Sequence, residues 1–105
     1  MNRPAKIFLA AATLTLLCAV PALAGKSSSE LGKKLFNDPG LGGSTNATNC
    51  NSCHPNGKKL EKAGARKDLS KMINRCIVGP LKGKQIDGRS VSMRSLKLYI
   101  KDLAK

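Results

Sequence analysis

The residues with the clearest chemical potential are two cysteines and a histidine in the run Cys50-Asn51-Ser52-Cys53-His54. Two residues between the thiols let both sulfurs reach the two vinyl groups on one edge of a porphyrin. The adjacent histidine then lies under the ring, where it can bind the iron. This spacing predicts one covalently attached haem c, with thioethers from Cys50 and Cys53 and with His54 as the proximal iron ligand.

A zinc site or a redox dithiol could also use a Cys-x-x-Cys motif. A structural zinc ion would need further cysteine or histidine ligands in a matching pair, and His54 is the only histidine of the chain. A thioredoxin-like dithiol belongs to a βαβ context, of which this sequence gives no sign. Haem attachment is therefore the interpretation that we adopt.

The beginning of the chain predicts export. A basic start precedes an apolar stretch over residues 7–20, and Ala22-Leu23-Ala24 fits the cleavage site of a signal peptide. The apolar stretch is short for a membrane span, so we expect no stable membrane anchor. We therefore expect a signal peptide at residues 1–24, cleaved after Ala24, and one domain at residues 25–105 in the periplasm.

The exported part of the chain is strongly basic. Without Arg3 and Lys6, 17 basic residues stand against all six acidic residues, which gives a formal net charge of +11. Opposite charges speed encounter, so this charge favours acidic redox proteins or multihaem cytochromes as partners, membrane-bound ones included. Export and the lack of a nucleic-acid-binding motif argue against nucleic acid as a partner. We expect a monomer.

Hydrophobic periodicity predicts helices and no strand, so the expected fold class is all-α. Ser27 and Glu30 are spaced as a capping box at the start of a short helix, which Asp38-Pro39-Gly40 ends. Asp68 is placed to cap a second helix, whose apolar stripe runs over residues 69–77. These signals leave residues 55–67 as a loop.

A last helix is predicted to start near Ser90 or Ser92. Its apolar face is formed by Met93, Leu96, Ile100 and Leu103. After residue 24, the chain has only Phe36 and Tyr99 as aromatic residues, and so small a domain struggles to bury enough apolar surface. A haem would supply the missing apolar body, and Leu60 is expected to pack against it.

Gly32 and Phe36 in the first helix, the haem motif, and Leu96 and Tyr99 in the last helix together resemble class I cytochrome c. The resemblance implies that the N- and C-terminal helices cross closely, with a small residue on one and an aromatic on the other, over a haem-centred core. The chain looks most like small single-haem periplasmic electron shuttles, including those of iron-oxidising bacteria.

The function implied by this resemblance is a soluble carrier of single electrons. No group of side chains suited to acid, base or nucleophilic catalysis is evident, so we expect that the protein is not an enzyme. Two alternatives stay open. The chain could be the haem subunit of a larger redox enzyme, or a haem sensor or enzyme with an open sixth coordination site.

The sixth iron ligand is not fixed by the sequence. Met93, expected to face the core from the first turn of the last helix, is favoured, and Cys76 and Met72 on the stripe of the second helix are alternatives. The segment Ile73-Asn74-Arg75-Cys76 is also similar to haem domains of sulfur-oxidising dihaem cytochromes, some of which use a cysteine as distal ligand. Class I members often hold the ring N–H of the histidine with a proline carbonyl about ten residues later. That proline is missing, so another carbonyl must orient His54.

Overall fold

Helices are the only regular secondary structure in residues 26–105, the part of the chain that the computed structural model describes. In chain order the elements are α2 (Ser29–Phe36), η2 (Leu41–Gly43), α3 (Cys50–Cys53), η3 (Pro55–Gly57), η4 (Ala63–Ala65), α4 (Leu69–Val78) and α5 (Val91–Asp102). The predicted all-α class is confirmed. The predicted signal peptide lies outside the described residues.

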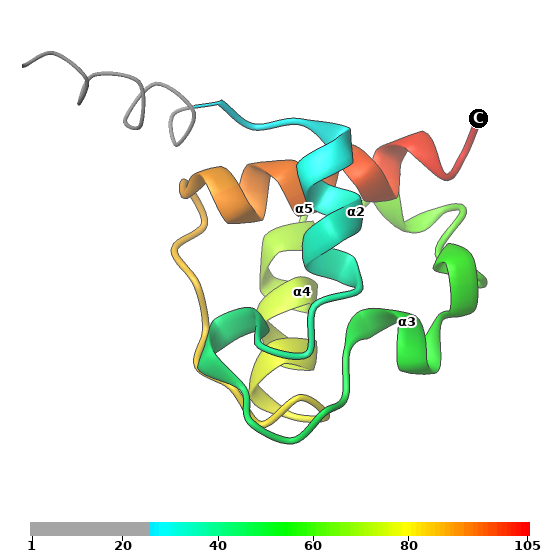
Figure 1. The fold of residues 1–105 in the computed structure, drawn as a ribbon. Helices are drawn as coiled ribbons and strands as arrows, with labels where there is room; N and C mark the ends of the chain where they lie inside the picture. The colour runs from blue at the N-terminus through cyan, green and yellow to red at the C-terminus, as the bar shows by residue number, and fades with distance from the viewer. Residues whose placement is uncertain (1–25) are drawn as a thin grey trace, which may run out of the picture.

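Helices α2 and α5 cross in close contact (Figure 1), as the resemblance implied. Gly32 permits the approach, because a Cβ there would collide with the carbonyl oxygen of Ser95 and lie 2.8 Å from the Cβ of Tyr99. The rings of Phe36 and Tyr99 meet at a centroid distance of 5.1 Å and a tilt of 58°. The buried Ser95 hydroxyl also accepts a hydrogen bond from the Ser28 N–H at 3.0 Å. This crossing forms the upper half of the fold in Figure 1.

The helix starts follow the sequence closely, with two differences. Ser28 rather than Ser27 caps α2, because its hydroxyl accepts the N–H of the residue three positions on at 3.0 Å. Asp68 does precede α4, but its carboxylate makes no cap and pairs instead with Arg66, at an N···O distance of 2.8 Å. Ser90 caps α5 as predicted.

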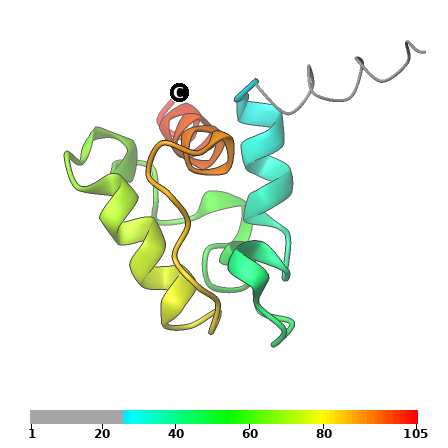
Figure 2. The ribbon, with the colours of Figure 1, turned by 90° about the vertical axis from the view of Figure 1, so that its left-hand side faces the viewer.

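Helix α4 lies on the other side of α5 from α2, and Figure 2 shows α5 nearly end-on between them. Its position depends on loops as much as on helix contacts. The Asn74 side chain binds the backbone of Ile86 twice, donating to its carbonyl at 2.9 Å and accepting from its N–H at 2.8 Å. The Lys84 N–H donates to the Gly42 carbonyl at 2.8 Å, so the loop after α4 is also fixed to the loop after α2.

Nine apolar side chains form the buried core of the described residues: Phe36, Leu41, Leu69, Ile73, Ile77, Leu81, Met93, Leu96 and Ile100. They come from α2, η2, α4, α5 and the loop at residue 81, so every long helix contributes. Within residues 26–105, no helix is both long enough and apolar enough to cross a membrane.

Candidate haem-binding site

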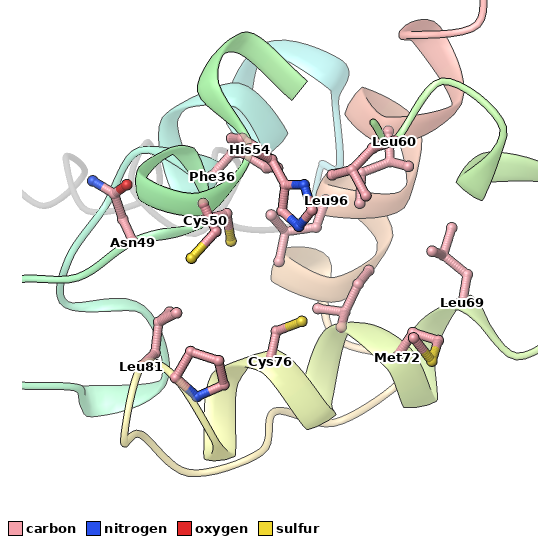
Figure 3. Close-up of a pocket in the computed structure, with 14 residues that line it drawn as sticks. Phe36, Asn49, Cys50, His54, Leu60, Leu69, Met72, Cys76, Leu81 and Leu96 are labelled. Carbon is pink, nitrogen blue, oxygen red and sulfur yellow. The ribbon is translucent and has the colours of Figure 1, made fainter. Parts of the chain in front are cut away.

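An apolar cavity of about 260 Å³ lies between α3 and α4 (Figure 3). It is lined by Phe36, Asn49, Cys50, Cys53, His54, Leu60, Leu69, Met72, Ile73, Cys76, Pro80, Leu81, Leu96 and Ile100. None of these residues is a carboxylate, lysine or arginine. The structure thus brings the three residues of the predicted haem motif to the wall of one apolar space, together with Leu60.

The haem motif is folded into a one-turn helix by its own polar residues. Asn49 caps α3, accepting the Ser52 N–H on its side-chain oxygen at 2.9 Å, while the Ser52 hydroxyl accepts the Asn49 N–H at 3.1 Å. This reciprocal capping box starts the helical turn, and in such a turn Cys50 and Cys53, three residues apart, lie on the same side. The Asn49 amide also donates to the carbonyl of Asn37 at 2.9 Å, which fixes the motif to the end of α2.

The ring of His54 is oriented by a backbone carbonyl. Its Nδ1 lies 3.0 Å from the carbonyl oxygen of Lys58, which leaves Nε2 free for iron. The expectation that a carbonyl other than the usual proline holds this ring is met at Lys58. The turn that presents it has positive φ at Asn56 (55°) and Gly57 (80°), and the Asn56 N–H donates to the Asn51 side chain at 2.7 Å. An acceptor of this kind behind the ligand fixes its tautomer and raises its basicity.

Gly57→Ala is expected to raise the reduction potential of the haem-loaded protein. Gly57 has a φ of +80°, which strains any residue with a Cβ, and that Cβ would also lie 2.5 Å from a methyl carbon of Leu103. We expect the strained turn to shift, which moves the Lys58 carbonyl away from His54. Loss of that hydrogen bond weakens the preference for ferric iron, and a tenfold weakening corresponds to about 59 mV for one electron. Potentiometric titration measures the shift.

The matched control is Asn56→Gly, which keeps the positive φ and the N–H donor and should leave the potential unchanged. Asn51→Ala removes the acceptor for the Asn56 N–H without a steric clash and should shift the potential in the same direction as Gly57→Ala. Equal potentials in all three folded variants would show that the Lys58 carbonyl does not tune His54.

Burial disfavours the thiolate form of two cysteines of the site, Cys50 and Cys76, in the chain without haem. Burial, followed by the neighbouring Cys76, raises the pKa of Cys50 to about 11. Burial, followed by Cys53, raises the pKa of Cys76 as well. Cys76 of α4 lines the same cavity as the two cysteines of α3.

The sulfur-bearing residues on the wall opposite α3 are Cys76 and Met72. Figure 3 shows the Cys76 sulfur directed from α4 into the space below His54. The Met72 sulfur instead lies 3.8 Å from a guanidinium nitrogen of Arg75.

Met93, which the sequence favoured as the sixth ligand, does not line the cavity. It is fully buried in the core. Because α5 begins at Val91, residue 93 lies about one turn before Leu96, the first residue of this helix to reach the cavity.

Several contributors to the site were not foreseen: Asn49, Asn51, Ser52 and the Lys58 carbonyl. The capping box could have been found, because Asn49 and Ser52 have the required three-residue spacing around the first cysteine. The Lys58 carbonyl carried no sequence signal, since any residue supplies one.

The donor set fits a haem c. Two thiols and an imidazole lie together on one wall, the rest of the lining is almost wholly apolar, and the imidazole is already oriented by its second nitrogen. The fold and the site therefore define a c-type cytochrome, with a haem-based redox role.

A family model described as di-haem cytochrome c peroxidase matches residues 26–97. The chain belongs to this family, whose members bind covalently attached haem c and are typically periplasmic. No curated protein and no solved structure matched the chain. The family match supports the prediction that the chain is a c-type cytochrome. It does not support the single-haem class I group that the sequence resembled, because the matched family is di-haem.

The family corrects one expectation. We expected no enzymatic activity because the chain lacks a side-chain constellation for acid–base or nucleophilic catalysis. Di-haem cytochrome c peroxidases are an enzyme family, so membership points to enzymatic activity. The expectation was wrong because a haem brings its own redox chemistry, which side chains alone do not reveal.

Proposed function

We propose that residues 25–105 form a periplasmic domain with a single haem c that carries one electron at a time between redox partners. The observation behind this proposal is the cavity in which Cys50, Cys53 and the oriented His54 meet. The chain contains one Cys-x-x-Cys-His motif, so it supplies attachment for one haem where the family name implies two.

When bound, the haem supplies a one-electron couple between ferrous and ferric iron. The protein residues determine how that couple behaves. The two thiols would attach the group, His54 would hold its iron, and apolar side chains such as Leu60 and Leu96 would exclude water from the site. A rigid, dry surrounding lowers the rearrangement that each electron transfer requires.

The test is a redox titration of the haem-loaded protein that is monitored through its optical spectrum. We expect a single reversible transition that fits one electron, with one haem per chain by mass. A mass corresponding to no haem, or a couple that is not reversible, would overturn the proposal.

Peroxide reduction is a second candidate function, favoured by the family match. Reduction of H₂O₂ to two waters consumes two electrons and two protons, whereas one ferrous haem supplies one electron on becoming ferric. A second electron would therefore come from an external donor such as a partner haem protein. Mixing the ferrous protein with H₂O₂ in a stopped-flow instrument, with and without ascorbate as the donor, decides whether catalytic turnover occurs.

We also propose that Cys76 is the distal iron ligand, in place of Met93. Cys76 lies on the wall opposite His54 with its sulfur in the cavity, whereas Met93 lies in the core and the Met72 sulfur contacts Arg75. A thiolate stabilises ferric iron, so this ligand would lower the reduction potential.

Cys76→Ser is expected to change the low-spin spectrum of the oxidised protein and to raise its potential by on the order of 100 mV, within the range of about 0.8 V that axial ligands span. Met93→Leu and Met72→Leu should leave the spectrum unchanged. Electron paramagnetic resonance of the oxidised variants provides the measurement. A far-red thioether-to-iron band in the parent protein that disappears in Met93→Leu would restore the methionine assignment.

A further inference from the structure

The side of α4 that faces away from the cavity carries a shallow hollow. We call this surface the α4 outer face and define it by Lys71, Asn74, Arg75, Val78 and Gln85. Lys71 and Arg75 lie one turn apart on the same side of the helix and are exposed. Val78 is 51% exposed, the larger exposed fraction of the two large apolar side chains that are exposed in the described residues. The surface thus combines two cations with an exposed apolar residue.

Neither cation of the α4 outer face forms an ion pair within the described part of the chain. The nearby Asp68 carboxylate is paired with Arg66, which is the chief cause of its lowered pKa, and Lys71 adds only a lesser effect. The ion pairs within residues 26–105 join Arg66 to Asp68 and Lys105 to Asp102, so Lys71 and Arg75 take part in none. No acidic residue of this part lines the hollow, and the Asn74 side chain is already used by the backbone of Ile86. The positive charge is therefore available to a partner.

The α4 outer face is directly behind the candidate haem site. The inner side of the same helix lines the cavity with Met72 and Cys76. The Arg75 guanidinium reaches around the helix to within 3.8 Å of the Met72 sulfur. Because a helix with its side chains is about 10–12 Å across, a molecule on the outer face would lie about one helix diameter from the cavity.

Building on the electron-transfer function proposed above, we propose that the α4 outer face is the docking surface for an acidic redox protein. A formal net charge of +11 for residues 25–105 opposes association with a second copy and favours a partner of opposite charge. Protein docking surfaces combine apolar with polar side chains, and Val78 lines this hollow together with Lys71 and Arg75.

The first experiment maps where an anion of the right charge docks. The probe is hexacyanochromate(III), a redox-inert paramagnetic trianion, added to the ¹⁵N-labelled haem-loaded protein. We expect amide signals of residues 71–78 and Gln85 to broaden first. Broadening centred on Lys33 and Lys34 of α2, or spread evenly over the surface, would overturn the proposal.

The second experiment measures electron transfer to hexacyanoferrate(III) from the ferrous protein by stopped flow. The double variant Lys71→Glu/Arg75→Glu should react on the order of tenfold more slowly at low salt, with the difference fading as salt is added. The control, Lys33→Glu/Lys34→Glu, alters the net charge by the same amount on exposed positions of α2 and should lose much less. Equal losses would show that only net charge matters.

The failure of this proposal is distinguishable from failure of the carrier function. If the ferrous protein does not transfer an electron to hexacyanoferrate(III) at any salt concentration, the carrier function is wrong. If transfer is rapid but insensitive to Lys71 and Arg75, the carrier function stands and the α4 outer face is not the docking surface.

Discussion

Gly32→Val is expected to destabilise the domain by about 3 kcal/mol or more, which for a domain of this size lowers the melting temperature by at least about 12 °C. Even a Cβ at residue 32 would collide with the carbonyl oxygen of Ser95, which is backbone and cannot rotate away. The α2–α5 crossing must open, and with it the contact between Phe36 and Tyr99. Circular dichroism of the haem-loaded variant during heating measures the loss.

Gly88→Val is the matched control. A Cβ at residue 88 would have no neighbouring atom within 4 Å, and Gly88 has no positive φ. The same substitution there should therefore change stability by no more than about 0.5 kcal/mol. Equal melting temperatures for the two variants would show that the helix crossing does not limit stability.

Cys50→Ser/Cys53→Ser is expected to abolish covalent haem attachment. A hydroxyl does not form the thioether, so the haem could be held only by His54 and apolar contacts and would be lost on denaturation. Mass spectrometry and haem-stained denaturing gels measure the loss. The haem-free protein should be largely unfolded, because so short a domain, with Phe36 as its large buried aromatic, buries little apolar surface without the group.

Cys76→Ser serves as the control for this variant, because Cys76 lies across the cavity and outside the attachment motif. It should keep the full haem mass on a denaturing gel. A well-dispersed amide spectrum from the haem-free double variant would contradict the expected dependence of folding on haem.

Local signals in the sequence predicted the three longer helices, α2, α4 and α5, but not α3 or the short 3₁₀ turns. The spacing of Leu69, Ile73 and Ile77 marked α4, and Ser90 marked the start of α5, because helix periodicity and caps depend on neighbours within a few residues. The cap of α2 was misplaced by one residue, at Ser27 instead of Ser28, since three consecutive serines offer the same hydroxyl.

The sequence by itself determined the haem motif, the all-α class and the close approach at Gly32, because each depends on residue types at fixed short spacings or on a family pattern. Which sulfur faces His54 was decided by the tertiary structure. Met93 and Cys76 both lie on apolar helix faces, and only the placement of α4 opposite α3 puts Cys76 in the cavity and leaves Met93 in the core. The role of the Lys58 carbonyl could likewise not be predicted from the sequence. Every residue carries a backbone carbonyl, and only the fold directs this one at His54.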